Sequence, residues 1–468
     1  MKSKSIPRPL FTVVALVPFA AGTLMAQTAS VWLTAPDRSS LVTKQPNGLQ
    51  FSHPKKDVPT IAVDDAKKFQ TIDGFGFALT GGSAQLLMHM SAPARASLLK
   101  QLFSTDGDGI GVSYLRVSIG SSDMNANVYS YDDLPEGETD PTLAKFSLAH
   151  DEVDVIPALK EILAINPKIK ILGSPWSAPT WMKTNDNFKG GTLKPEYYKT
   201  YAKYFVKYIE GMRAAGITID AVTVQNEPLN PKNTPSMVMF ARQEDNFIKD
   251  ALGPAFKKAH IRTKILIYDH NPDVTSYALS ILKDPDASQY VDGSAWHLYG
   301  GEISALTAVH DAFPNKNIYF TEQSISDGRH HTNIDVSEPV SDVVIGATRN
   351  WSKNVLLWNL AADPENGPHT NGGCTSCTGA ITLDGDNAML NAAYYVIAQA
   401  SKFVPPGSVR VDSNDVEQLA NVAFRTPDGK IVLIVSNTGN FPTTFNVSYH
   451  GKAMTATLPP ADVATYVW

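Results

Sequence analysis

Two glutamates in this chain follow apolar, β-branched runs, and each stands where such a run ends. Glu227 comes after "IDAVTVQN" (219–226), and Glu322 comes after "NIYFT" (317–321). A charge at the end of a buried strand is costly to desolvate, so we expect both carboxylates to serve a function. Two carboxyl groups that flank one bond can hydrolyse a glycoside. One of them, protonated, assists the leaving oxygen, and the other, ionised, attacks the sugar or activates water.

The spacing of the two glutamates fits a repeated strand–helix unit. They are 322 − 227 = 95 residues apart, which is three units of about 32 residues in a barrel of alternating strands and helices. From about residue 70 the chain shows eight apolar, β-branched runs, at 71–79, 111–120, 169–177, 219–228, 263–271, 291–300, 317–324 and 354–361. Helical patterns lie between them, for example at 91–104, 152–166, 196–216 and 236–260.

This alternation predicts an α/β fold, a (β/α)8 TIM barrel. A doubly wound sheet is the alternative. It is disfavoured because the strand number is eight and no Gly-x-Gly-x-x-Gly motif follows the first strand.

In such a barrel the chemistry gathers at the carboxyl ends of the strands. The residues at those ends are Arg116, Asp123, Trp176, Asn226, Glu227, Asp269, His270, Trp296, His297, Tyr299, Glu322, Trp358 and Asn359. Strand ends three units apart face each other, so we expect Glu227 and Glu322 to lie across the barrel mouth. Taken singly, either glutamate could instead be the salt-bridge partner of Arg116, and the roles of Asp269 and His270 stay open.

The two flanks of the predicted barrel read as antiparallel β-structure. Residues 27–69 are polar and Pro-rich with short β-like pieces, and residues 404–468 contain strand runs around the hairpin turn Pro427-Asp428-Gly429. We expect a barrel over residues 70–403 and an attached antiparallel β-sandwich formed from both chain ends.

The first 26 residues have the pattern of a secretory signal peptide. Lys2, Lys4 and Arg8 precede the apolar run 10–26, and a small residue precedes the expected cleavage after Ala26. An uncleaved membrane anchor is the alternative, but the run is short for a membrane span and contains Pro18. The protein is therefore expected to be secreted or periplasmic, without stable membrane association.

The composition and the cysteines narrow the function classes. The formal net charge is −6 with 18% charged residues, which argues against a nucleic-acid partner. The two cysteines of the chain, Cys374 and Cys377, form "CTSC" in a Gly-rich loop. Two cysteines make at most half of a structural zinc site, so in an exported chain a local disulfide is favoured over a metal site. We expect neither a metal nor a cofactor.

Several motifs, taken in order, resemble glycoside hydrolase family 30. They are "DGFGFALTGGSA", "SPWSAPTWMKTN", "QNEP", "WHLY", "YFTEQS" and "LLWNLAADPENGP", and the resemblance runs from about residue 70 to the C-terminus. The family groups lysosomal glucosylceramidase with microbial β-1,6-glucanases and related β-glycosidases. It implies a retaining double displacement in a (β/α)8 barrel fused to a β-sandwich.

The resemblance also implies a role for each site residue. Glu227 of "QNEP" would be the acid/base and Glu322 of "FTEQ" the nucleophile. Asp123, Trp176 and Trp358 match residues that hold the non-reducing sugar ring in the family. Asn226 would bind the 2-hydroxyl of the sugar. His297 and Tyr299 match residues that support the nucleophile, and Arg116 matches the arginine beneath it.

Physical expectations accompany these roles. An apolar strand and an indole beside Glu227 should raise its pKa, as a proton donor needs, and hydrogen bonds from Tyr299 and Arg116 should keep Glu322 ionised. A retaining mechanism predicts carboxyl groups about 5–5.5 Å apart.

The loop residues indicate a substrate class. "WHLYGGEIS" and "FPNKNIYFTEQS" resemble the microbial β-1,6-glucanase branch, so we expect an endo-acting enzyme on β-1,6-glucan. Hydrolysis of a β-glucoside by exo action, or of glucosylceramide, is the alternative. A non-catalytic glycan-binding barrel is a reading of another class, but it would tolerate loss of a carboxylate, and both glutamates are present.

Overall fold

The computed structural model describes residue 1 and residues 27–326 and 333–468. The predicted signal peptide, with cleavage after Ala26, therefore lies outside the described residues apart from Met1. Within the described ranges, no helix combines the length and the apolar character that a membrane crossing needs.

Eight parallel strands close into a barrel, which confirms the predicted fold class. The strands are β5 (Gly74–Leu79), β6 (Tyr114–Ser118), β7 (Lys170–Ser174), β8 (Ala221–Thr223), β9 (Lys264–His270), β10 (Val291–His297), β11 (Asn317–Glu322) and β12 (Ser352–Asn359). Strand β12 pairs with β5 and closes the ring. Seven of the eight strands lie within a run that the hydrophobic pattern predicts, and β12 begins two residues before its predicted run, 354–361. The fourth is much shorter than expected, because the strand ends at Thr223, before "VQNEP", and Glu227 has φ +43°.

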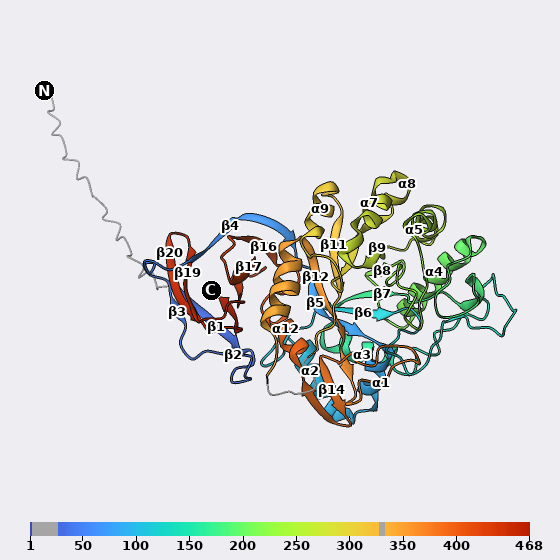
Figure 1. Ribbon diagram of the computed structural model, residues 1–468, viewed down its shortest axis with the longest axis horizontal. Helices are drawn as coiled ribbons and strands as arrows, with labels where there is room; N and C mark the ends of the chain where they lie inside the picture. Colours follow the sequence, from blue (N-terminus) through green and yellow to red (C-terminus); the bar gives the residue numbers. More distant parts are fainter. Residues whose placement is uncertain (2–26, 327–332) are drawn as a thin grey trace.

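Helices cover the outside of the barrel (Figure 1). They are α1 (Gly81–His89), α2 (Ala92–Phe103), α3 (Val155–Ile165), α4 (Tyr198–Ala214), α5 (Ala241–Phe247), α6 (Gly253–Lys258), α7 (Thr275–Lys283), α8 (Pro285–Ser288), α9 (Ala305–Ala312), α10 (Ser337–Pro339), α11 (Gly346–Arg349) and α12 (Ala392–Ser401). A π-helical turn, Ile248–Leu252, joins α5 to α6, and another, Val340–Ile345, joins α10 to α11. Helix α4 buries Tyr201, Tyr204, Phe205 and Tyr208, so its aromatic stripe is core.

The barrel interior is layered along its axis. Seven strands each contribute one residue to an apolar layer: Tyr114, Leu172, Ala221, Leu266, Ala295, Tyr319 and Leu356. Side chains two residues apart on a strand share a face. The next inward positions, Arg116, Ser174, Thr223, His297, Thr321 and Trp358, therefore form a polar and aromatic layer at the carboxyl ends. The apolar layer separates this layer from the opposite end of the barrel.

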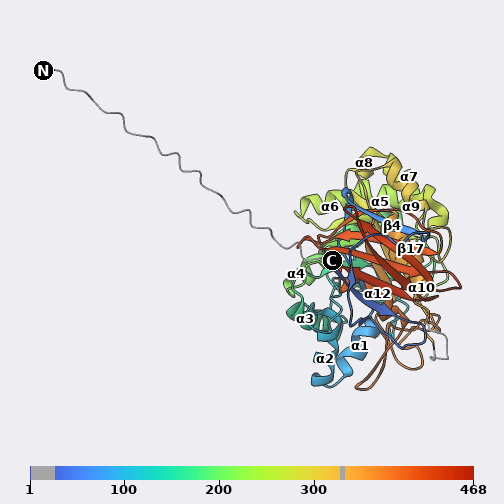
Figure 2. The ribbon, with the colours of Figure 1, turned by 90° about the vertical axis from the view of Figure 1, so that its left-hand side faces the viewer.

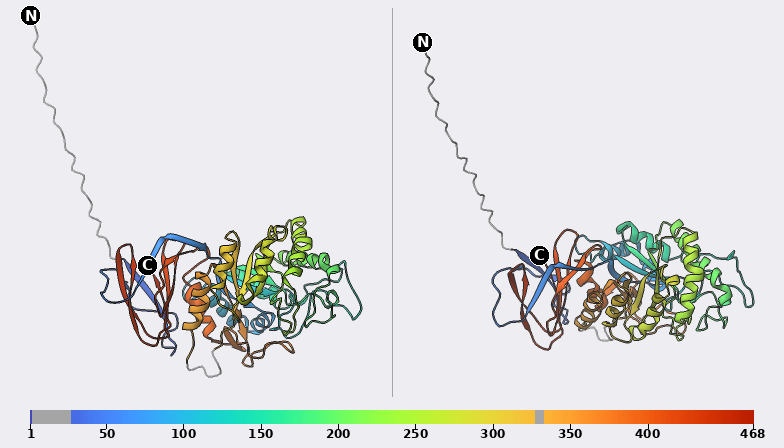
Figure 3. Two further views of the ribbon diagram at one scale, coloured as in Figure 1. Left: turned by 45° about the horizontal axis from the view of Figure 1, so that its top comes forward. Right: turned by 90° about the horizontal axis from the view of Figure 1, so that it is seen from above.

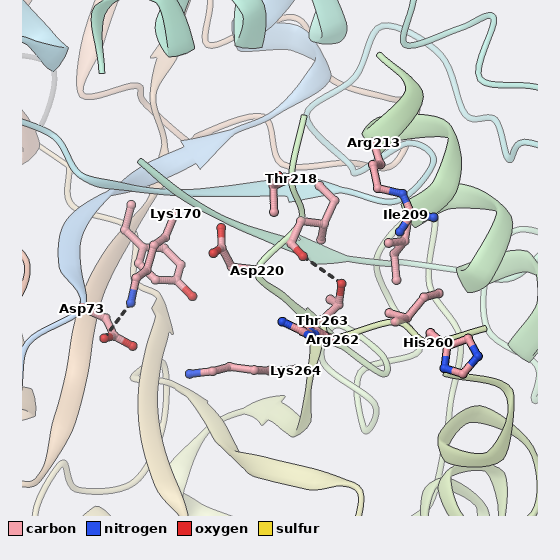
Figure 4. A pocket seen from close by; sticks show the side chains of 13 residues that line it. Asp73, Lys170, Ile209, Arg213, Thr218, Asp220, His260, Arg262, Thr263 and Lys264 are labelled. Atoms are coloured by element: carbon pink, nitrogen blue, oxygen red, sulfur yellow. Dashed lines mark hydrogen bonds and ion pairs between the residues drawn. The ribbon is translucent and has the colours of Figure 1, made fainter. Parts of the chain in front are cut away.

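The opposite end of the barrel holds a hollow of about 470 Å³ beneath the apolar layer (Figure 4). Lys170, Asp220 and Lys264 stand at the starts of strands around it, and Lys170 Nζ lies 2.8 Å from Asp73 Oδ1. The charge of Asp73 is thus paired with that of a lysine. This end of such a barrel usually contributes to stability rather than to chemistry. We therefore place the candidate site at the other end.

Another group of strands forms a β-sandwich beside the barrel (Figures 1 and 3). These are β1 (Thr28–Thr34), β2 (Thr43–Lys44), β3 (Leu49–Gln50), β4 (Thr60–Thr71), β16 (Val409–Ser413), β17 (Leu419–Arg425), β18 (Ile431–Asn437), β19 (Thr443–Tyr449), β20 (Lys452–Leu458) and β21 (Val463–Val467). The long strand β4 pairs with β16 over one part of its length and with β19 over another, so the sheet folds over an apolar core of its own. Both chain ends thus contribute to the β-sandwich (Figure 2).

Helix α12 lies between the sandwich and the barrel (Figure 1). Its Gln399 donates from Nε2 to Thr34 Oγ1 at 2.6 Å and accepts from Thr465 Oγ1 at 2.6 Å. Three short strands, β13 (Ala361–Ala362), β14 (Ile381–Asp384) and β15 (Asn387–Leu390), form a small sheet, and the loop that joins β13 to β14 reaches the barrel mouth.

Candidate active site

Arg116 occupies the centre of the polar layer and has no exposed surface. Its Nη1 donates to Glu322 Oε2 at 2.5 Å, and its Nη2 donates to Asp269 Oδ2 at 2.8 Å and to Asn226 Oδ1 at 2.6 Å. The guanidinium carbon also lies 4.8 Å from the Trp176 ring centre. One buried cation thereby joins the ends of four strands or their following loops.

Asp269, whose role the sequence leaves open, is the fully buried anion that this arginine requires. Besides Arg116, it accepts hydrogen bonds from the hydroxyls of Ser174 and Thr223, each at 2.8 Å, and of Thr321 at 2.6 Å. Burial alone would raise its pKa, but Arg116, His297 and Thr321 together hold the pKa of Asp269 far below its usual range. Asp269 therefore stays ionised and acts as a structural counter-ion.

His297 links this anion to both glutamates. Its Nε2 lies 3.2 Å from Asp269 Oδ1, while its Nδ1 lies 3.4 Å from Glu227 Oε1 and 3.7 Å from Glu322 Oε1. Burial lowers the pKa of His297, but the charge of Glu322 and the contacts with Asp269 and Glu227 outweigh burial and raise it to about 9. The imidazole is thus the positively charged imidazolium at neutral pH, and its ring nitrogens face the carboxylates around it.

Glu227 does not have the raised pKa that we expect from its sequence neighbours, and that prediction is wrong. Burial does raise the pKa, but the hydrogen bond and charge of His297 lower it to about 2. Asn230 Nδ2 adds a further donor, at 2.7 Å from Glu227 Oε2. The sequence pattern shows the apolar strand beside Glu227 but not a protonated imidazole from a strand 70 residues away.

Glu322 carries the hydrogen bonds that we predict for it, yet the direction of its pKa shift differs from the expected one. Its Oε1 accepts from Tyr299 Oη at 3.0 Å and its Oε2 accepts from Arg116. Burial is the largest influence and raises the pKa of Glu322 above its usual value, against the charges of His297 and Arg116. Burial of Glu322 thus opposes its charge, while Arg116, Tyr299 and His297 favour it.

An aromatic and acidic wall lies beside this charged cluster. The rings of Trp176 and Trp358 are 5.4 Å apart, and the Cys374–Cys377 disulfide packs against them. Asp123 is buried in the same wall, and its Oδ1 has no hydrogen-bond partner among the described residues. Burial, with the charges of Glu322 and Glu227, raises the pKa of Asp123 to about 7. A carboxyl group with a free oxygen beside two indoles suits a sugar hydroxyl and ring.

Most of the predicted residues lie together at the carboxyl end of the barrel. Trp296 instead packs against Tyr268, and Asn359 accepts from Thr80 and Ser83, so neither lines the pocket. A pocket of about 700 Å³ is lined by Asp123, Trp176, Asn226, Glu227, Tyr299, Glu322, Trp358, Cys374 and Cys377 among others. Arg116 and His297 lie beneath it.

A metal ion is a further ligand to consider. One donor atom each from Glu227, His297 and Glu322 lies within 4.8 Å of the others, so the set could hold a cation. Arg116 and Tyr299 already donate to Glu322, and Asp269 already orients His297. These contacts fit two carboxylates that exchange a proton through His297 better than they fit a set of metal ligands.

Sequence reasoning misses the carboxylate that supports this cluster from outside the barrel. Glu244 on α5 has no exposed surface, accepts from Tyr268 N–H at 3.1 Å and accepts from Tyr277 Oη at 2.6 Å. Tyr268 and Asp269 have φ values of +76° and +60°, so Glu244 holds an irregular end of β9. The hydroxyls of Ser174, Thr223 and Thr321 are also missed, although inward alternation along their strands would have found them.

Comparison with known protein families gives matches over both parts of the chain. The family model described as "Glycosyl hydrolase family 30 TIM-barrel domain" matches residues 72–404. The model described as "Glycosyl hydrolase family 30 beta sandwich domain" matches residues 407–466.

Individual relatives are similar over most of their length. An endo-1,6-beta-D-glucanase of Aspergillus fumigatus is 34% identical over 437 residues, which cover 87% of each chain. Lysosomal acid glucosylceramidase of Mus musculus is 30% identical over 436 residues, covering 87% of this chain and 83% of the mouse protein. Among solved structures, an endo-beta-1,6-glucanase superposes with a TM-score of 0.87 and 36% identity, covering 94% of this chain and 99% of that one.

The buried Glu244 predicts a pH dependence of stability. Burial raises its pKa to about 7 in the folded protein, from an ordinary value of 4.5. The folded state binds this proton more tightly than the unfolded state, so the stabilising contribution is complete below the ordinary value and is lost as pH rises to about 7. We expect Glu244→Gln, which cannot ionise, to remove up to about 3 kcal/mol of this pH-dependent loss.

The measurement is the free energy of unfolding by urea at pH 4.5 and pH 7.5, for wild type and Glu244→Gln. The difference between the two pH values should be smaller in the variant. Glu210→Gln, at an exposed position on α4, is the matched control and should keep the wild-type difference. An identical pH dependence in wild type and Glu244→Gln would contradict the prediction.

Proposed function

Because this chain belongs to glycosyl hydrolase family 30, we propose that it hydrolyses a β-linked glucan by double displacement, with Glu322 as nucleophile and Glu227 as acid/base. The observation that carries the proposal is the closeness of the two carboxyl groups. One oxygen of Glu227 and one of Glu322 lie within 4.8 Å of each other. Retaining enzymes hold their carboxyl groups about 5–5.5 Å apart, and inverting enzymes leave about 6.5–9.5 Å for a water molecule.

The first step is attack by Glu322 on the anomeric carbon. As the bond forms, the charge of Glu322 is neutralised in the glycosyl ester, while the glycosidic oxygen takes a proton from Glu227. The charge of Glu322 is the strongest influence that raises the pKa of His297. Its loss releases the imidazole proton toward Glu227 Oε1, 3.4 Å away, so the proton reaches the acid when the leaving group needs it.

The second step reverses the roles. Glu227 takes a proton from water, the water attacks the anomeric carbon, and Glu322 leaves as a carboxylate with the β configuration restored. Arg116 and Tyr299 donate to Glu322 and stabilise the returning charge. The amide oxygen of Asn226 is held by Arg116, which leaves its NH2 group for a sugar hydroxyl beside the reacting carbon.

β-1,6-Glucan is the substrate that we propose, cleaved within the chain. The fungal relative and the superposed structure are both endo-1,6-β-glucanases by name, whereas the glucosylceramidase relative is less identical. Glucosylceramide is the second candidate, since that relative still covers most of the chain.

Export completes the proposal, because β-1,6-glucan is a polymer that a cell meets outside its membrane. The basic start and apolar run of residues 1–26 support a signal peptide with cleavage after Ala26. The mature chain would then begin one residue before β1, the first strand of the sandwich.

Substitution of the two glutamates tests the mechanism. Glu322→Gln should lose at least about 1,000-fold in kcat on every substrate, since no covalent intermediate can form. Glu227→Ala should retain attack on 4-nitrophenyl β-glucoside, whose leaving group needs little protonation, and azide should restore turnover with β-glucosyl azide as product. Proton NMR of the product gives the configuration, and Glu210→Gln is the control. Wild-type turnover by Glu322→Gln would exclude its role as nucleophile.

A product profile tests the substrate. We expect wild type to release oligosaccharides from pustulan, a linear β-1,6-glucan, and to act at least about 100-fold more slowly on laminarin and glucosylceramide. Chromatography of the products over time separates cleavage within the chain from release of single glucose units. Exclusive cleavage of the lipid would replace the β-1,6-glucan proposal by the second candidate.

A further inference from the structure

His270 is a buried polar side chain at the pocket that has no role in the mechanism above. It is the last residue of β9, it is 9% exposed, and it lines the same pocket as Glu227. Its Nδ1 is buried and has no hydrogen-bond partner among the described residues. A ring nitrogen in this state loses its bond to water and gains none from the protein, which is costly unless a ligand supplies one.

The surroundings of His270 place it on the side of the pocket that receives the leaving group. It follows Asp269, whose carbonyl oxygen accepts from Glu227 N–H at 3.0 Å, so the imidazole lies directly beside the acid/base. The acid protonates the oxygen of the leaving group, and the leaving group therefore lies on this side. The indoles of Trp176 and Trp358 face Arg116 instead and line the same pocket as Asp123, and in the proposed mechanism this side receives the ring that is attacked.

The neighbours of His270 are also polar. Asn271 lines the pocket, and its side-chain oxygen accepts from Tyr299 N–H at 2.9 Å, which fixes the amide in place. The loop residues Asn230 and Asn233, which follow Glu227 in the sequence, also line the pocket. Burial lowers the pKa of His270, so the imidazole is neutral and has one donor and one acceptor nitrogen for hydroxyl groups.

We propose that His270, with Asn271, binds hydroxyl groups of the sugar on the reducing side of the cleaved bond and so selects a saccharide as leaving group. The proposal rests on the hydrolase function above and adds the chemical class of its leaving group. An aliphatic leaving group in the same place would cover the imidazole and leave it without partners, which selects against a lipid.

Three β-glucosides that differ in the leaving group test the proposal. The leaving group of gentiotriose is a sugar, which has hydroxyl groups and needs protonation of its oxygen. The leaving group of octyl β-glucoside is an alkyl alcohol, which needs protonation but offers no further hydroxyl groups. The leaving group of 4-nitrophenyl β-glucoside has no further hydroxyl groups and needs little protonation. We expect His270→Ala to lower kcat/KM for gentiotriose about 10- to 100-fold, as loss of hydrogen bonds in a desolvated subsite predicts. The values for the other two substrates should change by less than about threefold.

Two further variants keep the result interpretable. His270→Phe preserves the ring volume and removes both nitrogens, so it should repeat the loss on gentiotriose even if His270→Ala folds poorly. His89→Ala removes an exposed histidine at the end of α1 and should behave as wild type on all three substrates. Thermal melting curves of each variant report whether the fold is kept.

The outcomes separate the alternatives. An equal loss on gentiotriose and octyl β-glucoside would mean that His270 acts through the acidity of Glu227, and would overturn the subsite. No change on any substrate in a folded His270→Phe would overturn it as well. If wild type cleaves none of the three substrates, the hydrolase function itself fails. If wild type cleaves the aryl and alkyl glucosides but not gentiotriose, the hydrolase function stands and the saccharide subsite is overturned.

Discussion

The fully buried ion pair between Arg116 and Asp269 is the interaction on which the site depends. A guanidinium with no exposed surface is expensive to bury, and its attraction to carboxylates offsets that cost only when the remaining hydrogen bonds are also made. Ser174, Thr223 and Thr321 satisfy Asp269, which leaves Arg116 free to hold Glu322 and Asn226. The positions of the nucleophile and of a sugar-binding amide therefore follow from a charge pair that contacts no substrate.

The same network determines where the proton is stored. Two cations, Arg116 and the protonated His297, face the three carboxylates Asp269, Glu227 and Glu322, so one negative charge remains among five closely packed groups. The charge state of each group depends on the charges of the others. Neutralisation of Glu322 by the sugar changes the whole set, and this coupling links nucleophilic attack to proton delivery.

The sequence predicts the fold and most of the site because both rest on local patterns. Eight apolar runs alternate with helices, and polar residues at the run ends identify Glu227, Glu322, Trp176 and Trp358. Simple alternation along β9 would turn Tyr268 inward with Leu266 and leave Asp269 outside. The positive φ values at Tyr268 and Asp269 reverse this, so that Tyr268 packs against Tyr277 and Asp269 faces Arg116. No pattern in the sequence shows the reversal. The pKa values of Glu227 and Glu322 could not be predicted either, because they depend on burial and on the charges of His297 and Arg116 from other strands.

The irregular end of β9 also explains why a carboxylate can stand where the fourth strand ends. Glu227, Tyr268 and Asp269 all have positive φ, a conformation that costs each such residue about 1–3 kcal/mol and persists only when its surroundings enforce it. Glu244 enforces it from the helix side through Tyr268 N–H, and the Asp269 carbonyl enforces it from the barrel side through Glu227 N–H. The strain of these three residues lies at two adjacent strand ends, where it brings Glu227 Oε1 to His297. It also leaves His270, the next residue along β9, lining the pocket beside the acid/base.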